Sequence, residues 1–276
     1  MNTTKFSVAM CVYGKDNPEH FIQSVDSVWI KQTVKPDEMV LVVDGPVPDE
    51  LKNIICEYER DPNFRVIWFA ENQGHGYARR AGLAACKHEI VALMDADDIS
   101  LPHRFESQLP YFEDSAVDIV GGDIAEFSGE ESNIVAFRQV PMADKDIKIC
   151  MKDRCPFNQV SIMFRKSVYE EAGGYIDWYC EEDYYLWLRM MQKGAGFANT
   201  GTVLVNVRVG DDMYRRRGGL RYFKSEAKLQ KYMLDQGIIS VGTYIKNVGK
   251  RLIVQVLMPN RLRGWVFKKF ARKMVK

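Results

Sequence analysis

Three aspartates stand within four positions of the segment LMDADDISLPHRFESQL, residues 93–109: Asp95, Asp97 and Asp98. They follow an apolar run that is typical of a buried strand, and carboxylates this close together repel one another. A cation would compensate that repulsion. Mg²⁺ and Mn²⁺ prefer oxygen ligands, and water and substrate phosphates complete a site that has only one or two carboxylates. A single aspartate could equally cap a helix, but three indicate a metal–diphosphate site.

Two further segments carry residues suited to bind a nucleotide. Asp44 ends the apolar run 37–45, where a carboxylate could accept the N3–H of uracil or a ribose hydroxyl, or simply begin an Asp-Gly turn. In ENQGHGYARRAGL, residues 71–83, glycines and two arginines stand where a loop becomes a helix. Backbone N–H groups and the helix dipole favour anions at such a point. A flexible turn before a surface helix is the alternative.

The elements that would position these residues alternate between strand and helix. Apolar runs predict strands over 5–14, 37–45, 64–72 and 89–98, and helical spacing predicts helices over 18–32, 49–61 and 73–87. This alternation predicts an α/β fold with a parallel sheet, in which ligands bind at the carboxyl ends of the strands. Later segments predict a strand hairpin over 118–129 and 133–141, a strand and short helix over 159–175, a helix over 181–194 and a strand over 202–210.

Composition and charge narrow the class of protein. With 276 residues, 46% of them hydrophobic, the chain can bury the core of one large domain, and it has no run of 18 apolar residues that would cross a membrane. The six cysteines lack a C-x-x-C pair and the N-terminus lacks a secretory h-region, so we expect reduced, mostly buried thiols in a cytoplasmic protein.

Residues 246–276 hold ten Lys and Arg residues and no acid, which predicts an anionic partner for a basic tail.

Six segments together resemble one known enzyme family. Over about residues 5–210, six segments occur in the order and at the spacing seen in family 2 glycosyltransferases. They are SVAMCVYGKD, LVVDG, ENQGHGYARRAGL, LMDADDISLPHRFESQL, PFNQVSIMFRKSVYEEAGGY and EEDYYLWLRMMQKG. The chain looks most like bacterial enzymes that extend surface or capsular polysaccharides. The resemblance implies a GT-A fold, with a mostly parallel, Rossmann-like sheet flanked by helices. It also implies an inverting, metal-dependent transfer of a sugar from a UDP-sugar to a saccharide hydroxyl.

The resemblance assigns roles to individual residues of the nucleotide-binding half. It implies that Tyr13 lies against the uracil ring and that Asp44 is the uracil-binding acid. Asp95 and Asp97 match the metal-binding D-x-D pair of the family. Asp95 is expected nearer the ribose, and Asp97 is expected to be the more direct ligand of Mn²⁺ or Mg²⁺.

Some positions depart from the family pattern or are shared only in part. Arg79 matches an arginine of the family that serves the nucleotide-sugar, but Arg80 follows it where asparagine is usual. Asp98 completes the form DADD and is expected only to orient its neighbours. The basic segment 207–219 could close over the donor diphosphate or form a solvated turn, and none of the four histidines lies near it.

An inverting displacement also needs a group that takes the proton of the acceptor hydroxyl, which a carboxylate within hydrogen-bond reach can do. The segment EED offers Glu181, Glu182 and Asp183 at the start of a predicted helix. The resemblance assigns the role of base to Asp183. The alternative is that these acids merely complement the helix dipole. Tyr185 stands where many relatives carry a second aspartate, which we interpret as a change in contacts with the acceptor.

We expect a catalytic domain over 1–240, with a nucleotide-binding half (1–115) and an acceptor-binding half (116–240). A basic amphipathic helical tail over 241–276 follows, and Pro259 divides it into two short helices. Tryptophan and phenylalanine among basic residues suit the headgroup region of an anionic bilayer. The tail therefore predicts a peripheral protein on the inner face of the cell membrane that acts on a lipid-linked saccharide. Helices packed on the catalytic domain are the alternative. No motif for binding nucleic acid accompanies the charge.

The sequence is also compatible with two other functions. A sugar-nucleotide pyrophosphorylase also combines an α/β fold with a metal–diphosphate site, but it would need a Gly-rich basic loop after the first strand, and VYGKDNPEHF supplies too little of one. A non-catalytic, membrane-associated scaffold could keep the same fold. It would have no need of Asp95, Asp97 and Asp183 together.

Overall fold

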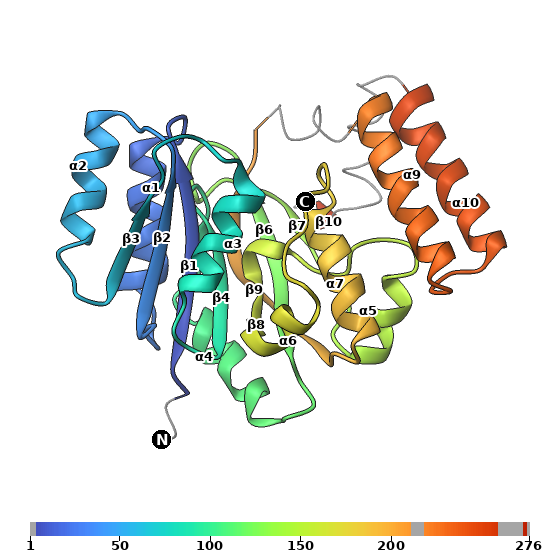
Figure 1. The fold of residues 1–276 in the computed structure, drawn as a ribbon, viewed down its shortest axis with the longest axis horizontal. Coiled ribbons are helices and arrows are strands. Elements are labelled where there is room, and N and C mark those ends of the chain that lie inside the picture. Colours follow the sequence, from blue (N-terminus) through green and yellow to red (C-terminus); the bar gives the residue numbers. More distant parts are fainter. Residues whose placement is uncertain (1–3, 211–217, 259–272, 275–276) are drawn as a thin grey trace.

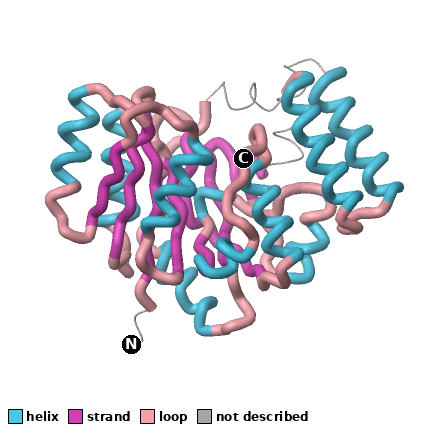
Figure 2. Tube along the Cα trace, viewed as in Figure 1, coloured by secondary structure: helices cyan, strands magenta, loops and turns pink. Residues whose placement is uncertain are grey.

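The computed structural model describes residues 4–210, 218–258 and 273–274. The strands of this part of the chain are Phe6–Tyr13 (β1), Glu38–Asp44 (β2), Phe64–Trp68 (β3), Ile90–Asp95 (β4), Ile99–Ser100 (β5), Ile119–Phe127 (β6), Ile134–Arg138 (β7), Met163–Arg165 (β8), Phe197–Arg208 (β9) and Lys273–Met274 (β10). They form one sheet in the order β10-β7-β6-β8-β4-β1-β2-β3, and β9 pairs with β5 and β6. Helices cover the sheet (Figures 1 and 2).

The helices are shorter than the amphipathic patterns predict. Their bounds are Pro18–Val25 (α1), Asp49–Tyr58 (α2), His75–Ala85 (α3), Arg104–Gln108 (α4), Asp144–Cys150 (α5), Lys166–Glu171 (α6), Glu182–Gln192 (α7), Leu220–Asp235 (α9) and Val241–Leu252 (α10). The pattern over 18–32 predicts one helix, but α1 continues into a wider π-type turn, Asp26–Ile30 (η1), and α10 continues in the same way into Ile253–Leu257 (η4).

The first half of the sheet is parallel, as the alternation of strands and helices predicts. β1 pairs in parallel with β2 and β4, and β2 pairs in parallel with β3. Both faces are covered, so neighbouring residues of a strand enter two different cores. One core includes Met10 and Leu41 with side chains of α1 and α2, and the other includes Ala9 and Val40 with side chains of α3 and α7.

The second half of the sheet is mixed. β6 and β7 form the predicted hairpin, β8 runs antiparallel to both β4 and β6, and β9 runs parallel to β6. The strands are therefore parallel, as expected, in the half formed by β1 to β4 and in the β6–β9 pair. The other pairs of the second half are antiparallel. The fold as a whole is the α/β arrangement of helices around a central sheet that the sequence predicts.

The C-terminal region begins with two helices, α9 and α10, that pack against each other at one end of the molecule (Figure 1). The predicted division at residue 240 falls between them, at Ser240, whose hydroxyl caps α10 by accepting the N–H of Thr243. Of the two short helices predicted on either side of Pro259, the first corresponds to α10 with η4. The second lies outside the described residues, as does most of the basic segment 207–219.

The strand register brings the predicted site residues to one edge of the sheet. Tyr13 lies opposite Asp44 in the β1–β2 pair, and Cys11 lies opposite Asp95 in the β1–β4 pair. Gly45 then turns the chain sharply, with φ +88°, and a Cβ on it would lie 2.6 Å from the backbone nitrogen of Asn72. Only glycine fits this close approach of the loops that follow β2 and β3.

Candidate active site

A cavity of about 550 Å³, here called the strand-end cavity, opens at the carboxyl ends of β1, β2 and β4. This is where ligands bind in open α/β sheets. Of the predicted site residues, Tyr13, Asp44, Asp95 and Asp97 line it, and Arg79 lies behind it. The remaining wall is formed by Cys11, Val12, Asp16, Asn72, Gly74, His75, Ala78, Ala96 and Glu182.

Asp44 is held by the loop that leads into α3. Its Oδ1 accepts the backbone N–H of Gln73 at 2.7 Å, and its Oδ2 accepts that of Gly74 at 3.0 Å. Gly74 has φ +89°, a conformation that favours glycine. The side chain is 5% exposed, and each carboxylate oxygen keeps a further lone pair for a ligand. Asp44 therefore fixes the loop and still offers an acceptor to the cavity. Tyr13, 42% exposed, presents its ring beside it.

Arg79 lies beneath the floor of the cavity. Its Nη2 forms an ion pair with Asp95 Oδ1 at 2.7 Å, its guanidinium lies 5.6 Å from the centroid of the Tyr175 ring, and the residue is 5% exposed. Burial alone would lower the pKa of Arg79, but Asp95 and other neighbours outweigh burial and raise it. Nη1 is buried without a hydrogen-bond partner within the described part of the chain. Arg79 thus orients Asp95 and keeps one unused donor.

Burial, and then the neighbouring carboxylates of Asp97 and Asp95, disfavour the charge of Asp16 and raise its pKa to about 6. Asp16 accepts the N–H of Tyr13 at 2.9 Å, so it is fixed at the end of β1. Asp98 instead points away from this cavity and accepts the N–H of Arg208 at 2.8 Å, and burial followed by the charge of Asp97 raises its pKa. Asp98 therefore joins the end of β4 to β9.

These residues fit a divalent ion that is completed by substrate. No three His, Cys, Asp or Glu side chains in the ranges that the structure describes are close enough to hold a metal by themselves. Asp95 and Asp97 nevertheless line one cavity with excess negative charge. One or two carboxylates, with phosphate and water supplying the other ligands, is the donor set that Mg²⁺ and Mn²⁺ accept in nucleotide sites.

A second cavity of about 330 Å³, here called the adjacent cavity, contains the predicted base Asp183. Asp95 lines both cavities. The first turn of α7 is divided between them, because Glu182 faces the strand-end cavity and Asp183 the adjacent one. Asp183 Oδ1 accepts the N–H of Tyr184 at 2.6 Å, which fixes the carboxylate. The other polar residues of this wall include Arg138, Arg154, Asn158, Gln159, Tyr222 and Glu226.

Sequence reasoning missed two residues of the strand-end cavity. Asp16 lies three residues beyond the end of β1, and the rule that ligands meet strand ends would have pointed to it. His75 begins α3. The nearby Arg79 guanidinium, and then burial, lower the pKa of His75 to about 4, so this imidazole is uncharged at neutral pH. The lowering of its pKa depends on a contact that only the folded chain creates.

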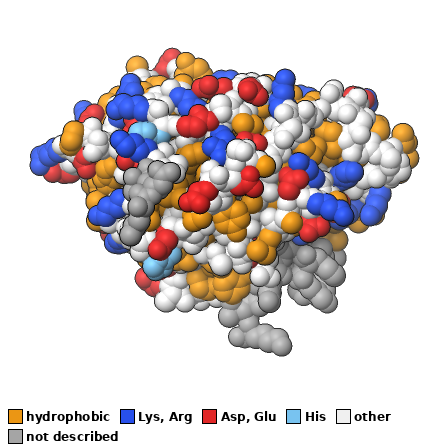
Figure 3. Space-filling view, turned by 90° about the horizontal axis from the view of Figure 1, so that it is seen from below, with side chains coloured by type: hydrophobic (Ala, Val, Ile, Leu, Met, Phe, Trp, Pro, Cys, Tyr) orange, Lys and Arg blue, Asp and Glu red, His pale blue; other side chains and the backbone are white. Residues whose placement is uncertain are grey.

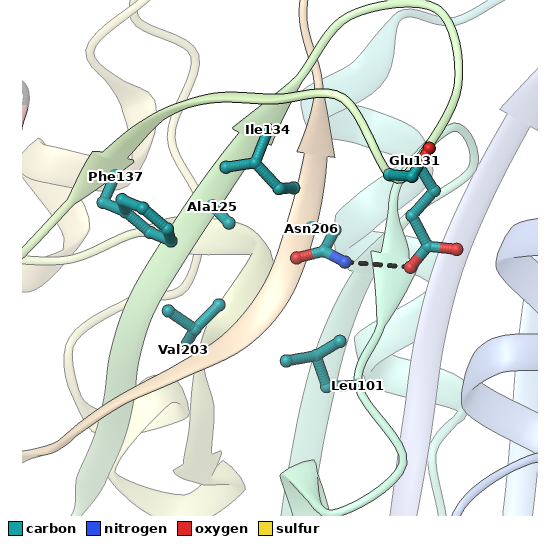
Figure 4. Close-up of a pocket in the computed structure, with 8 residues that line it drawn as sticks. Leu101, Ala125, Glu131, Ile134, Phe137, Val203 and Asn206 are labelled. Carbon is teal, nitrogen blue, oxygen red and sulfur yellow. Dashed lines mark hydrogen bonds between the residues drawn. The ribbon is translucent and has the colours of Figure 1, made fainter. Parts of the chain in front are cut away.

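A third cavity, shown in Figure 4, lies across the sheet from the adjacent cavity. Ala125 and Asn206 line it, whereas Ile124 and Val207, their neighbours along β6 and β9, line the adjacent cavity. Its wall is mainly apolar, and Asn206 donates to Glu131 at 2.8 Å within it. It contains none of the predicted site residues, so the candidate active site lies on the other face.

Comparison with known proteins identifies the family. The profile described as Glycosyl transferase family 2 matches residues 7–173, more than half of the chain. The chain is a family 2 glycosyltransferase. This assignment confirms the resemblance drawn from the six sequence segments, and it favours sugar transfer over nucleotide pyrophosphorolysis.

Relatives of this family 2 glycosyltransferase include enzymes of bacterial polysaccharide synthesis. The UDP-Gal:alpha-D-GlcNAc-diphosphoundecaprenol beta-1,3-galactosyltransferase of Escherichia coli is 34% identical over 99% of each chain. The amylovoran biosynthesis glycosyltransferase AmsE of Erwinia amylovora is 39% identical over 83% of this chain and 85% of that one. A mannosyltransferase of Pyrobaculum calidifontis, solved with GDP-Man and Mn²⁺, has a similar fold, with a TM-score of 0.63 at 14% identity over 94% of this chain and 71% of that one. The GT-A fold is thus confirmed.

Proposed function

We propose that this family 2 glycosyltransferase is a metal-dependent, inverting enzyme that transfers a sugar from a UDP-sugar to a hydroxyl of a lipid-linked saccharide during synthesis of a bacterial surface polysaccharide. The observation that carries the proposal is the position of Asp95. It lines both the strand-end cavity and the adjacent cavity, so a donor in the first and an acceptor in the second would meet beside it.

The strand-end cavity suits the nucleotide-sugar. Tyr13 offers a ring face for uracil, and Asp44 offers an acceptor that the loop N–H groups hold in place. Asp95 and Asp97 would hold Mn²⁺ or Mg²⁺. The ion, when bound, would offset the charge that develops on the departing diphosphate. Arg79 keeps the Asp95 carboxylate oriented for that role.

The adjacent cavity suits the acceptor. We assign Asp183 as the base, because its carboxylate is fixed and lines the wall that an acceptor hydroxyl would approach. Arg138 and Arg154 line the same wall and could pair with phosphate of a lipid diphosphate. The Escherichia coli relative, named for a diphosphoundecaprenol acceptor, supports this class of substrate.

In the proposed step the acceptor oxygen forms a bond to the anomeric carbon while the bond from that carbon to the phosphate oxygen breaks. The leaving UDP takes the electron pair, and Asp183 takes the hydroxyl proton. The oxygen attacks from the face opposite the leaving group, so the configuration inverts. No covalent intermediate with the protein forms.

We further propose that the chain is divided into a catalytic domain over 1–240 and a C-terminal region over 241–276. The nucleotide-binding and acceptor-binding halves of the catalytic domain meet near residue 115. The C-terminal region holds the protein at the inner face of the cell membrane. Among the described residues, no helix is both long and apolar enough to cross a bilayer. In this proposal the attachment is peripheral, with the C-terminal region against the membrane surface.

The test is calorimetric titration of the purified protein with UDP, with and without Mn²⁺, followed by an assay of transfer from UDP-sugars. Binding of UDP that requires the ion, together with turnover, supports the proposal and excludes the scaffold. If UDP, GDP and dTDP all fail to bind with the metal present, the proposal is wrong and the non-catalytic scaffold becomes the favoured alternative.

A further inference from the structure

Helix α10 with η4 is inverted relative to an ordinary surface helix. Its buried face is polar, and its residues stand four positions apart: Asn247, Arg251 and Gln255. Its water-exposed face carries five large apolar residues, each 38–68% exposed: Val241, Ile245, Leu252, Ile253 and Leu257. Lys246 and Lys250 are exposed among them. A surface helix normally turns its apolar stripe to the core. Here the core side is satisfied by polar contacts, and the apolar stripe faces outward.

The polar face makes several contacts with the rest of the protein, while Oε1 of Gln255 is buried without a hydrogen-bond partner among the described residues. Asn247 donates to Gln230 at 2.9 Å and to the Lys152 carbonyl at 2.8 Å. Arg251 forms an ion pair with Glu226 at 3.1 Å and donates to the Asp153 carbonyl at 2.7 Å. Rotating the helix to bury its apolar face would turn these groups to water and leave their partners, Gln230, Glu226 and the carbonyls of residues 152 and 153, without them. The outward orientation of the apolar face is therefore fixed.

The charge around this face is positive. Residues 218–258 contain seven Lys and Arg residues against two acidic residues. Figure 3 shows hydrophobic side chains beside Lys and Arg side chains at the end of the molecule formed by α9 and α10. An apolar stripe flanked by basic residues matches the headgroup region of an anionic bilayer, where apolar side chains enter the acyl boundary and cations stay with the phosphates.

The same helix is tied to the wall of the adjacent cavity. Glu226, the ion-pair partner of Arg251, lines that cavity. The carbonyls of Lys152 and Asp153, which accept from α10, directly precede Arg154 and Cys155 of the same wall. The position of the apolar face thus fixes the height of the cavity above whatever surface that face contacts.

We infer that the outward face of α10 and η4 lies on the anionic lipid surface that carries the acceptor. This contact holds the adjacent cavity at the level of the lipid headgroups. The inference rests on the proposed lipid-linked acceptor for its purpose, but the contact with lipid is measurable without any transfer. It assigns membrane attachment to residues 241–257, in advance of the basic segment that follows. A second copy of the chain covering this face is the competing outcome.

The test uses the full chain and sedimentation with vesicles of phosphatidylglycerol and phosphatidylcholine. The double variant Ile245→Gln, Leu252→Gln removes two side chains of the outward face. We expect its ratio of bound to free protein to fall roughly tenfold, because two apolar side chains lose their contact with lipid. The matched control is Ile22→Gln, Ile30→Gln, whose residues are 36% and 49% exposed near α1, at the other end of the molecule, and it should bind like wild type.

Sedimentation equilibrium and two acceptors complete the test. We expect both variants to be wild type in turnover on a water-soluble saccharide diphosphate with a short alkyl chain. On the same saccharide carried by a long lipid in vesicles, we expect only the α10 variant to lose turnover. Vesicle binding equal to wild type in the α10 variant would overturn the inference, as would a wild-type dimer that this variant converts to monomers. Loss of turnover by all proteins, with vesicle binding as expected, would count against the proposed function alone.

Discussion

The two backbone hydrogen bonds of Asp44 allow its structural role to be separated from nucleotide binding. In Asp44→Asn, one amide oxygen can still accept from Gln73 or Gly74, but the amide nitrogen then faces the other N–H group. A hydrogen bond to a charged group contributes about 1.5–3 kcal/mol. Losing one of the two in a site 5% exposed should therefore lower the free energy of unfolding by about 2 kcal/mol.

For a chain of this length, about 2 kcal/mol corresponds to a fall in Tm of roughly 4–8 °C. Thermal unfolding followed by circular dichroism measures it, with Glu59→Gln as an exposed control that should stay within about 0.5 kcal/mol of wild type. Titration with UDP at a temperature where both proteins are folded then measures binding. Weaker binding is expected even where the loop remains folded, because the proposed acceptor for uracil has changed.

An unfolding temperature equal to wild type in Asp44→Asn would refute the account of the loop, since both bonds could not then contribute as described. If stability falls as expected but the affinity for UDP is unchanged, Asp44 only fixes the loop and the assignment to uracil fails. Addition of saturating UDP and Mn²⁺ should raise the Tm of wild type more than that of the variant, because only ligand that binds the folded state stabilises it.

Three further expectations follow from the same site. Asp183→Asn should lower kcat by about 10²–10⁴-fold in a transfer assay while its affinity for UDP stays near wild type, because only the proposed base is lost. Asp97→Ala should abolish the dependence of UDP binding on Mn²⁺ in calorimetry. His75 has a pKa of about 4, below its ordinary 6.5, so the folded state binds fewer protons. Wild type should therefore lose stability relative to His75→Asn as the pH falls from 6.5 towards 4, and match it at pH 7.5 in thermal unfolding.

Each of these has an outcome that contradicts it. Equal loss of transfer and UDP affinity in Asp183→Asn would make that residue structural. Binding of UDP in Asp97→Ala that still rises with Mn²⁺ would place the ion elsewhere. A constant difference in Tm between His75→Asn and wild type from pH 5 to pH 7.5 would show that titration of the imidazole is not its cause. Glu59→Gln again serves as the exposed control for the first two.

The parallel half of the fold was predictable because its strands are buried on both faces. The continuous apolar runs that end at Asp44 and Asp95 predict β2 and β4 well, since few other structures bury every residue of such a run. The start of β9 was not predictable. The strand begins at Phe197, five residues before the predicted 202, because Phe197, Ala198 and Asn199 pair with β6, a long-range contact that the sequence does not show.

The site was predictable to the extent that it stands at strand ends. Tyr13, Asp44, Asp95 and Asp97 come together in one cavity because their strands are neighbours. The burial of Arg79 against Asp95 could not be read from the sequence, because it depends on how α3 packs on the sheet. For the same reason, nothing in EED shows that Glu182 and Asp183 face different cavities.

The C-terminal helix shows where pattern and packing diverge. The mixture of apolar and basic residues predicts an amphipathic helix, and α10 is one. The direction of its apolar face is decided by partners far away in the sequence, Glu226 and the carbonyls of 152 and 153. Polar residues four positions apart at 247, 251 and 255 were the available signal, but such a stripe normally indicates the solvated side of a helix.

The shared wall at Asp95 constrains how this enzyme could change its specificity. If donor and acceptor bind as proposed, a substitution at Asp95 would alter the binding of both at once. New preferences for one ligand can therefore arise independently only at residues that line a single cavity, such as Asn72 on one side and Arg154 on the other. Related enzymes would accordingly keep Asp95 and differ at the residues that line only one of the two cavities. The same fold could in this way form many different linkages.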